Sequence, residues 1–372
     1  MDNQAIKYEI IDNIGIIKGA NPPVNALSFD VRRGLIDTLK LFLEDNNIAG
    51  MILCGEGRTF FAGADISEFG KPMQSPNLND VIYEFENSNK PIVAALHGTP
   101  LGGGLELAMG CNYRVALSST NLGLPEVKLG IIPGAGGTQR LPRLAGIEKA
   151  LSMITSGIPI NAEDALNSEI IEEVFEDSLI EKAINFIKSK LSLDSHPIVS
   201  KLNEKVSNIN NEVFENFSNK IEKKYRGRKS PLCAIEAVKA TTTLNFTEGL
   251  EKERELFKLC HDSKESSSLI HMFFSERKAL KIPDISKDTS ILPIKSAAVI
   301  GCGTMGGGIA MNFANVGIPV TVIENSQESL DKGMKIIEKN NFNTVSKGRM
   351  SENEFKNRMS LIKGATNLES IV

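Results

Sequence analysis

Two glutamates, Glu106 and Glu126, lie 20 residues apart in a glycine-rich stretch between residues 97 and 140. A carboxyl group can take a proton from a reacting molecule and later return it. Two carboxyl groups that face one pocket could therefore hold a water molecule and move protons on and off carbon. The alternative is that both are solvated surface residues, as most glutamates are. Which interpretation holds depends on the elements that carry them.

The two glutamates are predicted to come from different elements. The triplet Gly102–Gly104 precedes an apolar helical pattern, so a helix should begin there and place its unpaired N–H groups one turn before Glu106. Glycine disfavours a helix, which indicates that another group approaches this backbone closely. Gly123 and Pro125 mark a loop or strand end just before Glu126. We therefore expect a helix and a loop to bring the two carboxylates to one site.

Three motifs in this part of the chain resemble those of one family. They are FFAGADISEF at 60–69, HGTPLGGGLELAMGCNYRVA at 97–116 and LPEVKLGIIPGAGGTQRLPRLAG at 124–146. In this order and spacing they are similar to the enoyl-CoA hydratase/isomerase (crotonase) family. The resemblance covers residues 1 to about 190 closely and the helices expected between 231 and 281 more loosely.

The resemblance implies a reaction and a set of site residues. The reaction would be hydration of a trans-2-enoyl-CoA to a 3-hydroxyacyl-CoA in fatty-acid β-oxidation, with Glu106 and Glu126 as the acid/base pair. The N–H groups of Ala64 and Gly103 would form the oxyanion hole for the thioester, each contributing roughly 3 kcal/mol. The presence of both carboxylates favours hydration over a double-bond shift, and isomerisation beside hydration stays open. The further substrate-binding residues would be Ala62, Asp65 and Gly134.

Structural roles are the alternative for several of these residues. Residues 62–65 could form a tight turn between a strand and a short helix, and the glycines from Gly134 could form a turn and a helix cap. We expect Arg140 and Arg143 to be solvated or to face another subunit. His97 is expected to be structural, because the glutamates already supply the proton chemistry.

A second glycine motif lies near the end of the sequence. A short strand is predicted at 297–300 and another at 320–323, with a helix between them. Glu324 comes 23 residues after Gly301, where a dinucleotide fold places an acid on the ribose hydroxyls. The pattern predicts a site for NAD over NADP, and the alternative is a glycine-rich turn in a generic α/β unit. The GxGxxG motif itself consists of Gly301, Gly303 and Gly306.

The elements that carry these residues predict an α/β fold. Alternating apolar residues predict a hairpin over 6–18, a helix should follow Ser28, and buried strands are expected at 51–54, 92–96 and 113–117. The resemblance implies a crotonase-type ββα spiral domain, a helical connecting region and a partial Rossmann-type dinucleotide-binding domain. We place these parts at 1–191, 192–282 and 296–372.

Together the two sites resemble the bifunctional enoyl-CoA hydratase/3-hydroxyacyl-CoA dehydrogenase arrangement. A complete dinucleotide domain has about six strands, whereas the last strand expected here is a third one near 359–363. All four histidines precede the glycine motif, so none is assigned as the dehydrogenase base. We therefore expect the dehydrogenase part to be truncated and inactive in this chain alone.

Two other interpretations stay open. One is a bifunctional hydratase and dehydrogenase whose second part is completed by a partner or a missing segment outside this chain. The other is a non-catalytic protein that binds acyl-CoA or NAD. The presence of both glutamates disfavours that second alternative.

Composition limits the ligands and the cellular location. The net charge of -4 gives no basic surface for nucleic acid. The five scattered cysteines form no CxxC pair, which argues against a metal site and favours a reducing compartment. No apolar run reaches the roughly 18 residues of a membrane span. We expect a cytoplasmic protein, or a peroxisomal one in a eukaryote, with an acyl-CoA substrate and NAD as cofactor of the second domain.

Overall fold

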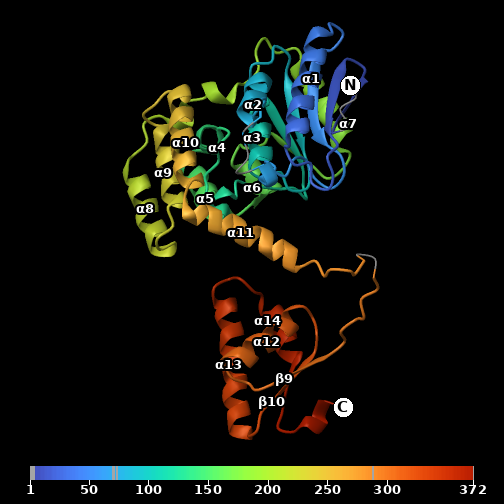
Figure 1. Cartoon of the computed structure of the whole chain (residues 1–372), viewed down its shortest axis with the longest axis vertical. Coiled ribbons are helices and arrows are strands. Elements are labelled where there is room, and N and C mark those ends of the chain that lie inside the picture. Colours follow the sequence, from blue (N-terminus) through green and yellow to red (C-terminus); the bar gives the residue numbers. More distant parts are fainter. Residues whose placement is uncertain (1–4, 69–71, 73, 287–288, 372) are drawn as a thin grey trace. The chain divides into compact units, whose positions relative to one another are not determined.

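The computed structural model describes residues 5–68, 72, 74–286 and 289–371. Its internal contacts divide the chain into two units, Met1–Lys281 and Ile282–Val372. Figure 1 shows both as ribbons, and each is described by itself. The helices between residues 192 and 281 pack within the first unit. The domain boundary predicted from the sequence near residue 191 stays a prediction.

A six-stranded sheet forms the centre of the first unit, with the order β1-β2-β3-β4-β5-β8. The predicted hairpin is confirmed, because β1 and β2 pair antiparallel and Ile11 lies opposite Ile14. All other neighbours in this sheet are parallel. The strands are β1 (Ile6–Ile11), β2 (Ile14–Gly19), β3 (Gly50–Gly55), β4 (Ile92–Leu96), β5 (Tyr113–Leu117) and β8 (Glu173–Phe175).

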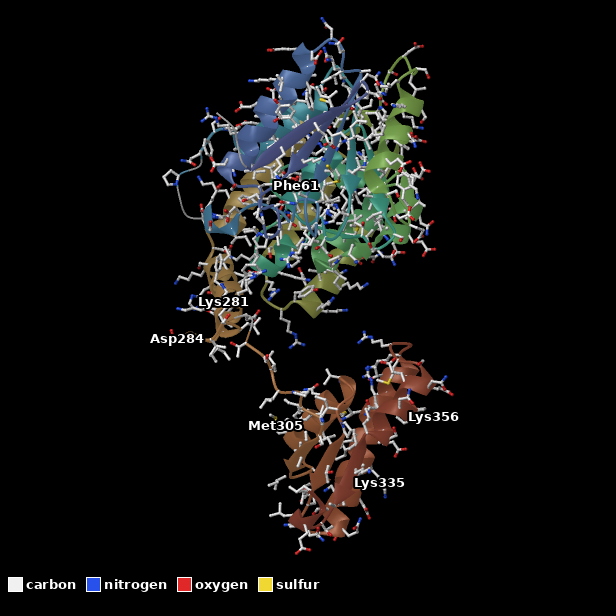
Figure 2. The ribbon with its side chains drawn as sticks, turned by 90° about the vertical axis from the view of Figure 1, so that its right-hand side faces the viewer. Phe61, Lys281, Asp284, Met305, Lys335 and Lys356 are labelled. Carbon is white, nitrogen blue, oxygen red and sulfur yellow. The ribbon has the colours of Figure 1, made fainter. Side chains whose placement is uncertain are left out.

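Both faces of this sheet are covered, which explains why its inner strands read as continuous apolar runs. In β3, Met51 and Leu53 belong to the core that includes α1 (Phe29–Glu44), α2 (Leu78–Glu86) and α3 (Gly103–Met109). Ile52 and Cys54 point the other way, into a second core formed with α7 (Leu179–Lys190). Figure 2 shows α1 (blue) and α7 (green) on opposite sides of the sheet. The predicted α/β class is therefore confirmed.

A group of helices follows the sheet strands and encloses the glycine-rich loop before α4. Helices α9 and α10 both pack on α4, and α11 packs on the short 3-10 helix η2 (Glu126–Leu129). Phe61 lies within the body of this unit, and Lys281 lies just beyond the end of α11 (Figure 2). The helices are α4 (Gly137–Ala145), α5 (Ile147–Ser156), α6 (Ala162–Asn167), α8 (Glu212–Lys224), α9 (Ser230–Ala240), α10 (Phe246–His261) and α11 (Lys264–Ala279).

The second unit contains a three-stranded parallel sheet in the described residues, with the order β11-β10-β9. The third strand begins at Ile362, later than the predicted 359–363, because residues 352–360 form a helix. Ser351 caps that helix by accepting a hydrogen bond from the N–H of Glu354. The elements are β9 (Ala297–Ile300), α12 (Thr304–Asn315), β10 (Val320–Ile323), α13 (Gln327–Ser346), α14 (Glu352–Ser360) and β11 (Ile362–Ala365).

Arg140 and Arg143 are buried, so the expectation that they are solvated is wrong. Other helices pack around α4 and exclude water from its charged side chains. Hydrogen-bond acceptors within the protein take the place of water. The guanidinium of Arg140 donates two hydrogen bonds to the carboxylate of Glu86, at 2.6 and 3.2 Å. Arg143 donates to the carbonyl of Gln139 at 2.7 Å. Both guanidinium groups also lie over the ring of Phe246.

Replacement of Glu86 by Gln should destabilise the first unit by about 3–5 kcal/mol, because it leaves the charge of Arg140 buried without a counter-ion. Asp37→Asn is the matched control, since Asp37 pairs with Arg33 on the exposed face of α1, and such pairs contribute about 0–1 kcal/mol. Urea unfolding of the full chain measures both free energies. Equal losses in the two variants would contradict the assignment.

Candidate active site

Glu106 is buried at the end of the first turn of α3, where only 3% of its surface is exposed. Its Oε1 accepts hydrogen bonds from the N–H groups of Ala135 and Gly137, both at 2.8 Å. Burial raises the pKa of this carboxyl group, while the two N–H groups and the charge of Arg140 oppose that rise. The side chain is thus fixed in position by the loop that precedes α4.

Glu126 begins η2 and lies against the N-terminus of α3. Gly102 caps this terminus with a φ of 53°, and a Cβ placed there would come within 2.8 Å of Glu126 Oε1. Oε2 is buried and has no hydrogen-bond partner among the described residues. Burial and the nearby charge of Glu106 raise the pKa of Glu126 well above its usual value. The structure therefore brings the two predicted carboxylates into one electrostatically coupled site.

The N–H groups of Ala64 and Gly103 also lie close together. A Cβ at Gly103 would lie 3.2 Å from the nitrogen of Ala64, and a Cβ at Gly104 would collide with the carbonyl of Phe61. Neither N–H group donates a hydrogen bond to an acceptor in the part of the chain that the structure describes. Since Gly102 touches Glu126, these two donors and the two carboxylates surround the same end of α3.

The remaining residues predicted for this site make local contacts. The N–H of Ala62 donates to the carbonyl of Val24 at 3.2 Å, and Asp65 accepts a bond from the N–H of Ser67 at 2.9 Å. These contacts agree with the turn that the sequence offered as the alternative, and contact with CoA stays a prediction. Phe69, the last residue of that motif, lies outside the described residues.

Gly134 and His97 lie on two other loops of the first unit. The carbonyl of Gly134 accepts a bond from Asn79 at 3.1 Å, and a Cβ at Gly134 would come within 2.7 Å of the ring of Phe257. A role for Gly134 in the pocket wall therefore stays a prediction. His97 Nε2 lies 3.2 Å from the carbonyl of Gly57, which agrees with the structural role expected for it.

A third buried carboxylate, Glu253 of α10, was not predicted from the sequence. Only 1% of its surface is exposed. It accepts hydrogen bonds from the N–H of Gly136 at 2.7 Å, the N–H of Thr138 at 3.0 Å and the hydroxyl of Thr138 at 2.5 Å. Its place in the buried stripe Gly249, Glu253, Leu256 and Cys260, at helical spacing, is the signal that could have revealed it. An acidic side chain on a buried helix face needs a hydrogen-bond donor or an opposite charge inside the protein.

Burial and the charge of Glu106 raise the pKa of Glu253 to about 8, although its three hydrogen bonds act in the opposite direction. The raised value indicates that the protonated form is favoured at neutral pH. Three carboxyl groups therefore share one desolvated region of the first unit, and each ionisation makes the next less favourable.

The second glycine motif forms a close turn in the second unit. Gly301 has a φ of 94°, Gly303 caps α12, and a Cβ at Gly306 would collide with the carbonyl of Gly301. Glu324 follows β10, and its Oε1 accepts a bond from the N–H of Cys302 at 2.6 Å. The structure therefore brings all four predicted residues together at the ends of β9 and β10 and the start of α12.

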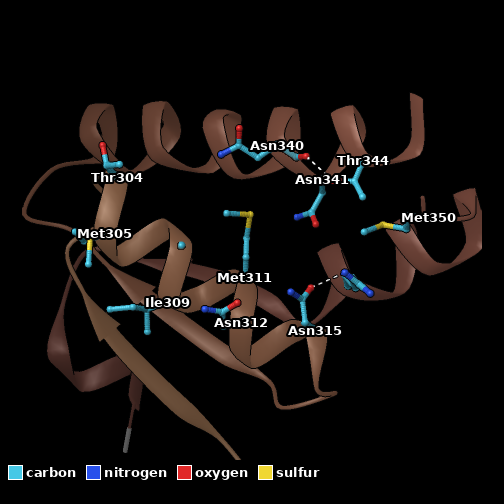
Figure 3. Close-up of a pocket in the computed structure, with 12 residues that line it drawn as sticks. Thr304, Met305, Ile309, Met311, Asn312, Asn315, Asn340, Asn341, Thr344 and Met350 are labelled. Carbon is cyan, nitrogen blue, oxygen red and sulfur yellow. Dashed lines mark hydrogen bonds between the residues drawn. The ribbon is translucent and has the colours of Figure 1, made fainter. Parts of the chain in front are cut away.

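A hollow of about 580 Å³ lies between α12, α13 and α14 of the second unit (Figure 3). Thr304 and Met305 lie at one end of its lining, which is rich in asparagine. Arg358 donates to Asn315 at 2.6 Å, and Thr344 donates to the carbonyl of Asn340 at 3.2 Å. Within the described residues, its lining includes Thr304 and Met305 of the motif but neither the three glycines nor Glu324, so it adjoins the predicted dinucleotide site.

Comparison with protein families gives two matches that follow the two units. Residues 9–226 match the family described as enoyl-CoA hydratase/isomerase. Residues 296–372 match the NAD binding domain of 3-hydroxyacyl-CoA dehydrogenase.

Curated relatives match both parts of the chain. A peroxisomal bifunctional enzyme of Danio rerio is 40% identical over 345 residues, which cover 89% of this chain and 47% of that protein. A peroxisomal fatty acid beta-oxidation multifunctional protein of Arabidopsis thaliana is 34% identical over 383 residues, which cover 96% of this chain and 51% of that protein. The chain thus spans about half the length of the curated relatives it matches.

Solved structures support the fold of the first unit. An enoyl-CoA hydratase from Mycobacterium avium subsp. paratuberculosis K-10 is similar with a TM-score of 0.54 at 19% identity, over 73% of this chain and 96% of that one. At this identity the likeness shows the fold alone. Among the described residues, no helix has the length and apolar character that a membrane crossing requires.

Stability should fall as pH rises, and Glu253 should cause part of this fall. Its pKa is about 8 in the folded protein against a usual 4.5. Between these values the folded state keeps a proton that the unfolded chain has lost. The stabilisation is therefore complete below the unfolded pKa and is lost as pH rises through the folded one, with a change on the order of a few kcal/mol.

Unfolding by urea at a series of pH values from acidic to alkaline measures this dependence. Glu253→Gln, which carries no such proton, should flatten the curve, whereas the exposed neighbour Glu251→Gln should leave it as in the unmodified chain. A curve that keeps its full slope in Glu253→Gln would rule out this origin.

Proposed function

Because this chain belongs to the enoyl-CoA hydratase/isomerase family, we propose that its first unit hydrates 2-enoyl-CoA thioesters to 3-hydroxyacyl-CoA. The observation that carries this proposal is the clustering of Glu106 and Glu126 around the N-terminus of α3, beside the N–H groups of Ala64 and Gly103. Two carboxyl groups can add the elements of water across a double bond, and two N–H groups can hold the thioester oxygen on which negative charge develops.

The two N–H groups would bind and polarise the substrate. The thioester oxygen lies between the N–H groups of Ala64 and Gly103, which have no other acceptor among the described residues. Polarisation draws electrons from the double bond towards this oxygen and makes C3 electrophilic. Gly103 stands at the start of α3, where the peptide dipoles also favour negative charge.

The surroundings of the two glutamates divide the proton transfers between them. Burial raises the pKa of Glu106, but two N–H groups and the charge of Arg140 oppose that rise, so its carboxylate form is more accessible than that of Glu126 and suits a base. Burial and the charge of Glu106 favour the protonated form of Glu126, which suits an acid. Glu106 would take a proton from the water molecule as the water oxygen bonds to C3. Glu126 would donate a proton to C2. Transfer of the proton from Glu106 to Glu126 then restores both groups.

The second unit is proposed to bind NAD. Three features fit a dinucleotide: the close approach of Gly306 to Gly301, the helix N-terminus after Gly303, and the acid Glu324 at the tip of β10. Bound NAD would supply hydride transfer. In this unit Glu324 would accept hydrogen bonds from the adenosine ribose, and the N–H groups at the start of α12 would face the diphosphate.

We also propose that the chain acts in fatty-acid β-oxidation and resides in peroxisomes if its source is eukaryotic. The names of the relatives from Danio rerio and Arabidopsis thaliana support both points. Dehydrogenation of the hydration product would require residues beyond those assigned here, in a partner or another segment. Isomerisation of 3-enoyl-CoA stays a second proposal for the same two glutamates.

Glu106→Gln and Glu126→Gln should each lower the kcat for crotonyl-CoA hydration by about 10²–10⁴-fold, the usual contribution of a positioned acid or base. Loss of the enoyl-thioester absorbance measures the rate. Glu56→Gln, at an exposed pair with Lys7, is the control and should keep full activity. An unreduced kcat in Glu106→Gln would refute the assigned roles. Absence of turnover in the unmodified chain would favour the acyl-CoA binding protein.

Gly306→Ala should weaken NAD binding by roughly tenfold or more, because overpacking costs about 1–3 kcal/mol and the new Cβ would push the start of α12 away from Gly301. Gly308→Ala is the matched control in the same helix, where a Cβ meets open space. Titration calorimetry of the full chain with NAD gives the affinities. Equal affinities in the two variants would contradict the proposed site.

A further inference from the structure

Four successive peptide N–H groups before and within α4 alternate between two carboxylates. Those of Ala135 and Gly137 donate to Glu106, at 2.8 Å each. Those of Gly136 and Thr138 donate to Glu253, at 2.7 and 3.0 Å. One short segment is therefore held from both sides by buried side chains, and a shift towards either carboxylate lengthens the bonds to the other.

The backbone of this segment leaves little freedom for the two bonds to Glu106. A Cβ at Gly137 would lie 2.8 Å from Glu106 Oε1, and one at Gly136 would collide with the guanidinium of Arg140. Gly136 has a φ of 90°, a left-handed conformation that reverses the direction of successive N–H groups. The alternation is thus built into the backbone.

Helix α10 reaches the segment because a glycine lies one turn before Glu253. A Cβ at Gly249 would collide with the side-chain oxygen of Gln139 in α4. Residues four apart share a helix face, so this close approach brings Glu253 to Gly136 and Thr138. The hydroxyl of Thr138 gives Glu253 a third bond, at 2.5 Å.

We propose that Glu253 is a positioning residue for hydration: it fixes the segment 135–138 so that the N–H groups of Ala135 and Gly137 hold Glu106 in its reactive orientation. This inference rests on the proposed function. Glu253 acts through Glu106 and does not touch the substrate. A small displacement of a reacting group is costly, since roughly 1 Å of misplacement can lower a rate by about 10²-fold.

A double-mutant cycle on the full chain tests the role, with crotonyl-CoA as substrate. Glu253→Ala removes all three bonds and should lower kcat by about 10²-fold, with little change in KM because the proposed oxyanion donors are untouched. In Glu253→Gln the amide oxygen can still accept from the N–H of Gly136. The amide NH₂ that replaces Oε2 cannot accept from the N–H or the hydroxyl of Thr138, although it can donate to the hydroxyl oxygen, so kcat should fall about fivefold. Glu251→Ala, on the exposed face of α10, should match the unmodified chain.

The decisive measurement is the same substitution in a Glu106→Gln background, followed at high enzyme concentration. If Glu253 acts through Glu106, the further loss should disappear there, because residues that act as a unit are not additive. An equal loss in both backgrounds, or an unchanged kcat in Glu253→Gln and Glu253→Ala, would overturn the proposal. Circular dichroism reports folding. If Glu253→Ala fails to fold, Glu253→Gln alone is compared in the two backgrounds. An unchanged kcat in Glu253→Gln would then refute the positioning role.

The same data separate this inference from the function on which it rests. Hydration by the unmodified chain and its loss in Glu106→Gln establish the proposed function whatever the Glu253 variants do. An inactive unmodified chain would refute that function, and the positioning role with it. Normal hydration in both Glu253 variants would refute only the positioning role.

Discussion

The structure of the first unit depends on how its buried carboxylates find hydrogen-bond donors in place of water. A buried carboxylate is unfavourable unless hydrogen-bond donors or opposite charges replace the solvent. Glu106 and Glu253 obtain their donors from peptide N–H groups of one segment, and Glu86 obtains them from Arg140. Glu126 retains an oxygen without a partner among the described residues. This contrast separates the carboxylates that organise the backbone from the one with capacity left for a reacting molecule.

Glycine is what allows the backbone to serve these carboxylates. At Gly102 a side chain would displace Glu126, at Gly104 it would strike the carbonyl of Phe61, and at Gly137 it would displace Glu106. At these positions glycine is required because a Cβ would not fit, in addition to the conformational freedom that glycine gives. The entropy that glycine loses on folding is offset by the apolar core on this side of the sheet, to which α3, α4, α9 and α10 contribute. The site and the core are therefore stabilised together.

The sequence was most informative where the pattern is local. Gly102–Gly104 before an apolar helix, the strand periodicities and the GxGxxG motif each predict structure from residues close in the chain, and all are found. Contacts between distant segments were harder. Arg140 reads as a surface residue because its partner Glu86 lies 54 positions away. Glu253 lies 115 to 117 positions from the segment it holds. Its helical spacing with Leu256 and Cys260 is a local signal, but only tertiary packing shows that this face of α10 is buried.

The two units use the same local device for different chemistry. In both, a carboxylate accepts a bond from a peptide N–H in a glycine-rich turn: Glu106 from Gly137, and Glu324 from Cys302. Glu106 is closed off from water, which raises its pKa and suits proton transfer. Glu324 stays partly exposed at the tip of a strand, where a carboxylate can exchange water for the hydroxyls of a sugar. We infer that burial, more than the glycine motif itself, suits Glu106 to the proposed proton transfer and leaves Glu324 available for the proposed ligand.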